Sequence, residues 1–151
     1  MKIYFLLFIA SINLYACNST YQMTKEELSL INNGSIETPY KVLLTTDKQD
    51  SLFLRKKCKD IDITDIANNK DIRFFIERLK LTMAIESGVG IAAPQVGLGR
   101  NLFLFMRLDK PEHPVQVAIN PRIVNHSGNT FCFERDGCLS IPDISGNSIR
   151  Y

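Results

Sequence analysis

Two stretches of the chain carry residues that could do chemistry, and the first is GVGIAAPQ, from Gly88 to Gln95. Its small residues let the backbone approach a ligand closely, and Gly88 and Gly90 can adopt positive φ angles that other residues resist. Pro94 fixes the chain direction immediately before Gln95. Gln95 would then present a neutral amide from a rigid loop, which suits a developing oxyanion. A closely packed turn between a helix and a strand would explain the same composition without any chemistry.

The second stretch is FERDGCLSIPD, which has Cys138 at its centre, 43 residues after Gln95. This thiol could be a buried structural group, a nucleophile or a metal ligand. Apart from Cys17 near the N-terminus, the chain has Cys58, Cys132 and Cys138. An odd number predicts no disulfide framework, although export would favour oxidation, and a Cys132–Cys138 bridge or a bridge to Cys58 would remove the free thiolate.

In their order and spacing, the two stretches resemble the motifs of the peptide deformylases. The first family motif, G-x-G-x-A-A-P-Q, is matched at every fixed position. The second, E-G-C-L-S, is matched from Gly137 to Ser140, with Asp136 in place of the glutamate. The resemblance covers residues 42–151. It implies a hydrolase that removes the formyl group from N-formyl-methionyl peptides with a bound divalent metal, commonly ferrous iron.

The resemblance also implies chemical roles for three residues. Cys138 would be a thiolate ligand, a soft donor that suits Fe²⁺ or Zn²⁺. The metal would activate a bound water, which attacks the formyl carbon. Gln95 and the backbone N–H of Leu139 would stabilise the oxyanion that forms.

Five further residues receive binding or supporting roles from the same resemblance. Gly88, Val89 and Gly90 would line the peptide cleft, with Val89 against the methionine side chain. Arg150 matches a family arginine that pairs with the acid of the second motif, here Asp136. Because aspartate is one methylene shorter than glutamate, we expect this pair either to shift or to orient the neighbouring thiolate less firmly.

The other family ligands and the general acid/base come from a helical H-E-x-x-H motif, which this sequence lacks. Its two histidines, His113 and His126, are expected to be exposed loop residues, because no helix aligns them as ligands. One thiolate cannot hold a catalytic metal that normally needs three protein ligands. The sequence therefore predicts a deformylase truncated before this motif, inactive alone, with an apolar sheet face exposed. A non-catalytic exported homologue that binds peptides or a partner is the alternative, and a remnant without function is a third reading.

The elements that must position these residues follow from the hydrophobic pattern. Between Asp71 and Gly88, apolar residues recur at steps of three and four, which predicts a helix with one buried face, capped by Asn68 or Asn69. Strands are predicted over residues 101–108, 115–124, 130–134 and 137–141, the second interrupted at Pro121 and the last stopped by Pro142. This order predicts an α+β fold with a mainly antiparallel sheet packed with a long N-terminal helix. By the resemblance, a C-terminal helix is missing.

The N-terminus, MKIYFLLFIASINLYAC, predicts an export signal, because its apolar run is shorter than the about 20 residues of a spanning helix. Its end resembles the bacterial lipobox, in which the cysteine, here Cys17, is lipidated. Tyr15 is bulkier than the usual residue, and an ordinary signal peptide or an uncleaved anchor are the alternatives. We expect a signal at residues 1–17, a polar tether at 18–39 with a short helix at Thr24–Ile31, and one domain at 40–151.

The composition and the N-terminus of the chain indicate its partners and its location. The formal net charge is +2, and no basic stripe with interleaved aromatic residues is present, which gives no case for a nucleic-acid partner. The signal predicts an exported lipoprotein attached to a membrane, with a cytoplasmic protein as the alternative.

Overall fold

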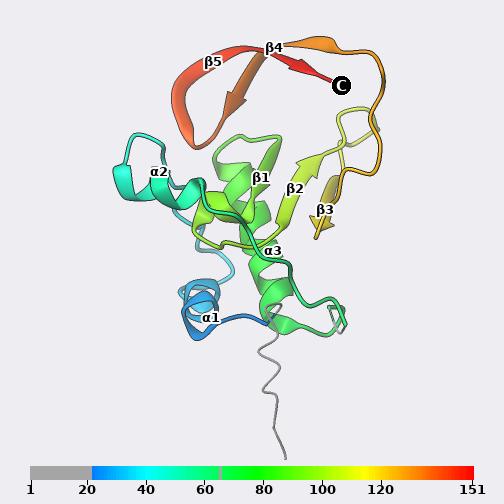
Figure 1. Cartoon of the computed structure of the whole chain (residues 1–151). Coiled ribbons are helices and arrows are strands. Elements are labelled where there is room, and N and C mark those ends of the chain that lie inside the picture. Colours follow the sequence, from blue (N-terminus) through cyan, green and yellow to red (C-terminus); the bar gives the residue numbers. More distant parts are fainter. Residues whose placement is uncertain (1–21, 65) are drawn as a thin grey trace, which may run out of the picture.

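The computed structural model describes residues 22–64 and 66–151, which form helices and two small sheets (Figure 1). The expected signal at residues 1–17, with Cys17, lies outside the described residues. In chain order the elements are α1 (Lys25–Asn32), α2 (Lys48–Leu54), α3 (Lys70–Ile85), β1 (Gly90–Ala92), the 3-10 helix η1 (Ala93–Val96), β2 (Leu102–Met106), β3 (Val115–Ile119), β4 (Phe131–Cys138) and β5 (Ile141–Arg150). Within the described ranges, no helix is both long and apolar enough to cross a membrane.

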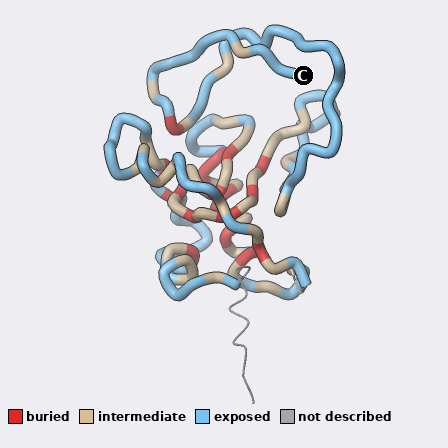
Figure 2. The backbone as a smooth tube through the Cα atoms, in the orientation of Figure 1, coloured by how far each residue is buried: buried red, intermediate tan, exposed pale blue. Residues whose placement is uncertain are grey.

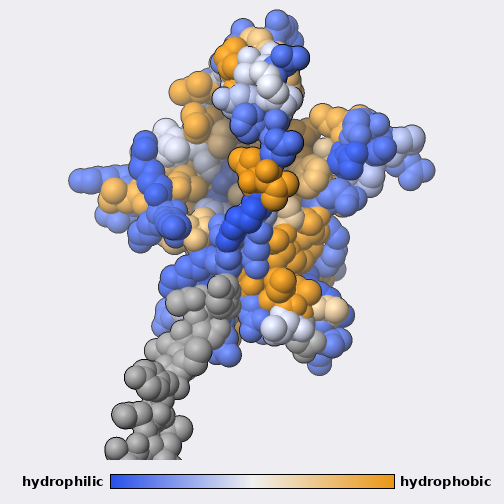
Figure 3. All heavy atoms as spheres, turned by 45° about the vertical axis from the view of Figure 1, so that its right-hand side comes forward, coloured by the Kyte–Doolittle hydropathy of each residue, from blue (hydrophilic) through white to orange (hydrophobic). Residues whose placement is uncertain are grey.

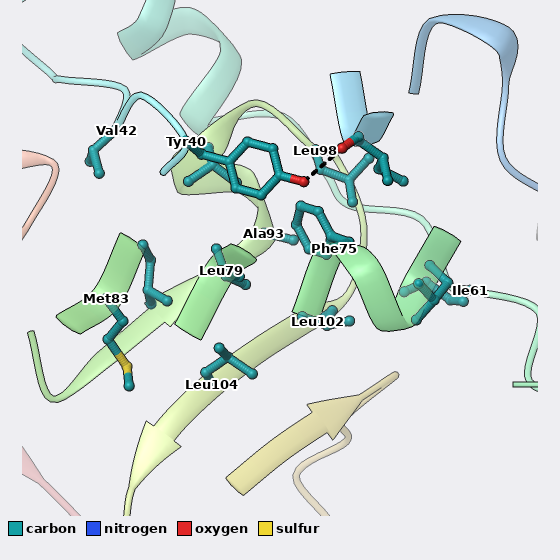
Figure 4. Packing of buried hydrophobic residues seen from close by; sticks show 14 residues of the cluster. Tyr40, Val42, Ile61, Phe75, Leu79, Met83, Ala93, Leu98, Leu102 and Leu104 are labelled. Carbon is teal, nitrogen blue, oxygen red and sulfur yellow. Dashed lines mark hydrogen bonds between the residues drawn. The ribbon is translucent and has the colours of Figure 1, made fainter. Parts of the chain in front are cut away.

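Helix α3 lies at the centre of the fold, and its prediction from the apolar period is confirmed. The Asn69 side chain caps the first turn by accepting a hydrogen bond from the Ile72 N–H at 3.0 Å. The apolar residues of one face are buried against the sheet and against Tyr40 (Figure 4). These residues are Ile72, Phe75, Leu79 and Met83.

Strands β1, β2 and β3 form an antiparallel sheet in that order. Alternate residues of β2, Leu102 and Leu104, are buried, and Leu104 pairs with the buried Ile91 of β1. The strands predicted at residues 101–108 and 115–124 are confirmed as β2 and β3. Strand β3 ends at Ile119, shortly before the interruption expected at Pro121, which has no N–H to donate to a ladder.

Strands β4 and β5 form a separate two-stranded hairpin, which lies at the opposite end of the molecule from α1 (Figure 1). The strand predicted at residues 130–134 is confirmed as the first part of β4. The strand predicted at residues 137–141 is wrong, because Leu139 and Ser140 form the turn between the two strands. Strand β5 then continues through Pro142, which an edge strand tolerates.

The segment expected as a polar tether instead packs on the rest of the chain from Gln22 onward. The expected short helix is present as α1, and its N-terminus has a capping box in which Thr24 and Glu27 exchange hydrogen bonds. Ile31 is fully buried and belongs to the core. Helix α1 contacts α3, so the folded unit extends about one helix further toward the N-terminus than the expected boundary at residue 40.

Two buried arginines hold this N-terminal segment. Arg100 is 1% exposed and donates from Nε and Nη2 to the two Glu27 carboxylate oxygens, at 2.7 and 2.6 Å. Burial alone would raise the pKa of Glu27, but the hydrogen bonds from Arg100 and Thr24 hold it below its ordinary value. Arg78 donates to the carbonyl oxygens of Thr38 and Ile31, both at 2.8 Å.

Burial is distributed very unevenly along the chain (Figure 2). All the buried hydrophobic residues of the described ranges lie between Ile31 and Leu104, and Ser140 is the single buried residue after them. The hairpin exposes several large apolar side chains, and hydrophobic atoms reach the surface at that end of the molecule (Figure 3). These hairpin residues are Phe131, Phe133, Ile141, Ile144 and Ile149.

Candidate active site

A cleft of about 870 Å³ lies where the end of α3, strand β1 and the turn of the hairpin meet. It brings together six of the residues that the sequence predicts for the site. They are Gly88, Val89, Gly90, Gln95, Cys138 and Leu139. Two segments more than 40 residues apart in the sequence therefore form one cavity.

The Gln95 amide has a fixed orientation in the wall of this cleft. Its residue lies on η1, and its Oε1 accepts a hydrogen bond from the Ala92 N–H at 2.9 Å. With the oxygen engaged, Nε2 points toward the hairpin, where it donates to Ser140 Oγ at 3.2 Å and toward Cys138 Sγ at 3.8 Å. The side chain thus places an amide donor beside the thiol, and such a donor can stabilise a developing oxyanion.

Ser140 is a site residue to which the sequence assigned no role. It is 3% exposed, and its hydroxyl accepts from Gln95 while its carbonyl oxygen accepts from the Thr45 N–H at 2.8 Å. These two hydrogen bonds attach the turn of the hairpin to the rest of the molecule. The sequence feature that could have identified Ser140 as a site residue was its place in the second motif, directly after Cys138 and Leu139.

The glycines of the first motif allow neighbouring segments of the chain to pack closely against them. A Cβ on Gly88 would lie 2.9 Å from Leu139 Cδ1, and one on Gly90 would lie 3.2 Å from the Leu104 carbonyl oxygen. Neither glycine uses the positive φ that it could adopt, and the left-handed conformation falls on Ser87, with φ of 55°. Glycine is therefore needed here for space between α3, β1 and the hairpin turn.

Asp136 and Arg150 form the expected ion pair across the hairpin. The Ser148 hydroxyl also donates to the same Asp136 oxygen, at 2.6 Å. The hydrogen bonds from Ser148 and Arg150 lower the pKa of Asp136. The shorter aspartate thus reaches its arginine, at a point where the β4–β5 register shifts on either side of Asp136 and Gly137. Such bulges re-aim side chains, and here the next residue is Cys138.

Cys138 is a free thiol in the structure, as are Cys58 and Cys132. A bridge between Cys132 and Cys138 is not formed, because both lie on β4 and the strand's rise separates their Cα atoms by about 20 Å. Burial raises the pKa of the Cys58 thiol, which makes it a poor nucleophile.

The described residues contain no complete set of metal ligands. Between residues 22 and 151, leaving out position 65, no three His, Cys, Asp or Glu side chains are grouped as a ligand set. His113 and His126 are both exposed, as expected, and the His126 ring instead contacts Tyr151 with centroids 4.4 Å apart. Cys138 is thus a single donor where a metal centre normally needs three.

Comparisons with known proteins agree with this geometry. The polypeptide deformylase family model matches residues 40–151. A curated peptide deformylase of Karelsulcia muelleri is 40% identical over 99 residues, which are 65% of this chain and 50% of the relative. The chain spans about half the length of the first curated relatives that it matches.

Solved structures show the same fold. The peptide deformylase of Thermotoga maritima has a TM-score of 0.62 and 31% identity, over 75% of this chain and 68% of that one. A class I type b peptide deformylase from Acinetobacter baumannii, solved with Met-Ala-Ser bound, has a TM-score of 0.64 and 25% identity, over 76% and 72% of the two chains. With both motifs in one cleft and the family model covering most of its length, the chain belongs to the peptide deformylase family.

Proposed function

We propose that this chain forms the peptide cleft, the oxyanion donors and one metal ligand of a peptide deformylase, which removes the formyl group from N-formyl-methionyl peptides. One observation carries the proposal. The Gln95 amide is anchored by its oxygen and directs its Nε2 to within 3.8 Å of Cys138 Sγ, in the wall of an open cleft. An amide donor fixed beside a thiol suits stabilisation of the oxyanion that forms when a carbonyl group bound in the cleft is attacked.

Peptide binding is assigned to the small residues of the first motif. Gly88 and Gly90 leave the backbone accessible, and Val89 is 57% exposed and lines the cleft, where it can contact a methionine side chain. The Acinetobacter relative was solved with the methionyl peptide Met-Ala-Ser, which supports a methionyl peptide as the ligand of this cleft too. In the oxyanion hole, the Leu139 N–H would join the Gln95 amide.

A divalent metal belongs to this proposal, with Fe²⁺ as the first choice and Zn²⁺ as the second. Cys138 is the one residue of the described cleft that we assign as its ligand, because thiolate sulfur suits both metals. The printed sequence contains no H-E-x-x-H, so two ligands and the acid/base have to come from elsewhere. We therefore propose that these 151 residues alone are inactive.

The test compares the chain alone with the chain supplemented in trans. The full 151-residue chain is incubated anaerobically with Fe²⁺ and a formyl-methionyl peptide, with and without a peptide from a relative that carries H-E-x-x-H. We expect no formate from the chain alone, formate from the mixture, and binding of Met-Ala-Ser by the chain in both cases. Formate release by the chain alone would overturn its inactivity, and absence of any peptide binding would overturn the function.

A second candidate function is an exported binding protein without catalysis. The observations that favour it are the apolar N-terminus ending in Cys17, the aspartate at position 136 and the absent histidine motif. In this reading the cleft holds peptides or a partner outside the cytoplasm, and lipidated Cys17 attaches the protein to a membrane. Cell fractionation with metabolic palmitate labelling tests the location. Label that persists in a Cys17→Ala variant would contradict it.

A further inference from the structure

A second cavity, of about 830 Å³, lies between α1, the segment that follows α1 and the end of η1. It shares no lining residue with the candidate cleft, although consecutive residues of η1, Gln95 and Val96, line one cavity each. None of the motif positions from Gly88 to Gln95 or from Asp136 to Ser140 lines it. The proposed function therefore gives this second cavity no role.

The wall of the second cavity contains one buried cation, Arg78. This residue is 1% exposed, and its guanidinium carbon lies 3.9 Å from the centroid of the Tyr40 ring. Two of its nitrogens, Nε and Nη1, donate to the carbonyl oxygens of Thr38 and Ile31. The third nitrogen, Nη2, has no acceptor at hydrogen-bonding distance and angle among the described residues. The guanidinium is thus held in a fixed orientation with one nitrogen unused.

Two observations place Nη2 at the cavity. No fully buried side-chain nitrogen or oxygen in the described part of the chain lacks a hydrogen-bond partner, so Nη2 must keep some exposure. That exposure faces the cavity, because Arg78 lines it. Gly34 also lines the cavity and leaves the space beside Nη2 open, since a Cβ at this position would lie 3.2 Å from the nitrogen. A positively charged donor is therefore available to a ligand.

The charges around the second cavity are mainly positive. Lys25, on α1, and Lys41 line it together with Arg78, and both lysines are exposed. Neither lysine forms an ion pair with a residue that the structure describes. Glu26 is the single carboxylate among the described residues of the lining. Three cations and one carboxylate favour an anionic ligand.

The rest of the wall is largely apolar. Small-molecule sites typically have volumes of about 300–1,000 Å³ and apolar walls, with a few polar groups that fix the orientation of the ligand. The second cavity has this volume and this composition, which fit a ligand with one anionic group on an apolar body. Its apolar lining residues are Leu30, Pro39, Tyr40, Leu43 and Val96.

We propose that the second cavity binds a small organic anion, whose carboxylate or phosphate group is held by Arg78, Lys25 and Lys41 and whose apolar body contacts the rest of the wall. Hydrogen bonds from a guanidinium to an anion are stronger than neutral ones, and this guanidinium is already oriented by its two backbone acceptors. The two lysines add positive charge from exposed side chains. The inference does not depend on the proposed function, because the residues that carry it are separate from those of the candidate cleft.

Three probes of similar shape test the inference, namely benzoate, phenyl phosphate and the uncharged benzamide. Each is titrated into the full 151-residue chain and followed by nuclear magnetic resonance. Both anions should bind about tenfold more tightly than benzamide, because only they can accept a charge-assisted hydrogen bond from Arg78. The backbone amide signals of Gly34 and Lys41 should shift on binding. The tighter of the two anions identifies the preferred anionic group, and inorganic phosphate, which has no apolar body, should bind more weakly than phenyl phosphate.

Variants of the exposed residues identify the site without disturbing the fold. Arg78 itself is unsuitable, because it also holds two backbone carbonyls in the interior. The double variant Lys25→Gln, Lys41→Gln should weaken benzoate binding about fivefold, since each exposed charge contributes a few-fold in affinity. The matched control is Lys48→Gln, Lys110→Gln, which removes two exposed lysines that do not line the cavity. It should leave the affinity unchanged.

A change of opposite sign completes the test. Asn33→Asp keeps the size of an exposed side chain in the lining and adds a negative charge, so it should weaken benzoate binding about threefold, whereas Asn129→Asp, outside the cavity, should not. The inference is overturned if none of the probes binds, if benzamide binds as tightly as benzoate, or if inorganic phosphate binds as tightly as phenyl phosphate. Unchanged affinity in the lysine double variant, or signal shifts confined to Gly88, Val89 and Gly90 of the candidate cleft, would also overturn it.

Discussion

The two ends of this molecule are built differently. The body, residues 22–120, contains every buried hydrophobic residue of the described chain. The hairpin, residues 131–150, is exposed along most of both strands and contributes one buried residue, Ser140. An isolated two-stranded hairpin is marginally stable in water at best. The hairpin therefore depends on its contacts with the body, whereas the body has a core of its own.

The difference matters because the candidate site is divided between the two ends. Gln95 is fixed to the body by hydrogen bonds within its own 3-10 turn. Cys138 and Leu139 lie at the tip of the hairpin, where Ser140 and the packing of Leu139 against Gly88 hold them. The hairpin, which carries the proposed metal ligand Cys138, is thus the less buried of the two parts that form the site.

Truncation of a buried ring should show the largest contrast between the two regions. Phe75→Ala should lower the free energy of unfolding by about 4 kcal/mol, because the Phe75 ring is fully buried and its removal leaves a cavity in the core. Phe133→Ala, the matched change in the hairpin, should lower it by less than about 1 kcal/mol, since that ring is already 42% exposed. Urea unfolding measures both, and equal losses would show that the hairpin is packed as tightly as the body.

The next effect tests whether α1 is part of the body. Glu27→Gln should destabilise the fold by about 3 kcal/mol, because it leaves the Arg100 guanidinium buried without its carboxylate. The control is Asp109→Asn, which breaks an exposed ion pair with Arg107 and should change stability by less than about 1 kcal/mol. If the two variants unfold at the same urea concentration, α1 does not contribute as the structure indicates.

A smaller effect is expected where the hairpin joins the body. Ser140→Ala removes the hydroxyl that accepts the hydrogen bond from the Gln95 amide. It should weaken the attachment of the hairpin to the body by about 1 kcal/mol, which raises the equilibrium constant for local opening of the hairpin about fivefold. Hydrogen exchange of the β4 and β5 amides measures it, while amides of α3 should keep their protection. Ser127→Ala, an exposed serine with one local hydrogen bond, is the control. Faster exchange in α3 as well would contradict a local attachment.

The smallest effect is a pH dependence confined to the hairpin. The folded pKa of Asp136 lies below its ordinary value, so its stabilisation is present above the ordinary pKa and is lost as the pH falls through the lowered one. We expect the nuclear magnetic resonance signals of residues around Arg150 to shift in that acidic range. The change should be absent in Asp136→Asn. A shift that remains in this variant would assign the transition to another group.

Local pattern explains which elements could be predicted from the sequence. Helix α3 has regular apolar spacing over 16 residues, strand β2 is an unbroken apolar run of 5, and both are where the pattern places them. Strand β1 and helix η1 have three and four residues, too few to show a period. Helix α2 was also not predicted. Strand β5 contains DISGNSIR, whose polar and small residues give no strand signal.

Site residues could also be predicted where they lie in a short motif, and could not where their role depends on contacts between distant segments. Its six cleft residues could be named because they lie in two short motifs. The hydrogen-bond partners of Ser140 could not be predicted, because they depend on which segments the fold brings together. The packing of residues 22–39 was missed for the same reason, since its partners Arg78 and Arg100 lie 40 or more positions away.

The two buried arginines also determine where a recombinant version of this domain should start. The family match begins at residue 40, and that is the start point a sequence comparison would suggest. A protein cut there would retain the Arg78 and Arg100 guanidinium groups in its interior and discard Ile31, Thr38 and Glu27, which accept their hydrogen bonds. Expression from Gln22 or earlier keeps both sets of partners, so poor solubility of a shorter version would reflect the choice of start point and not the fold.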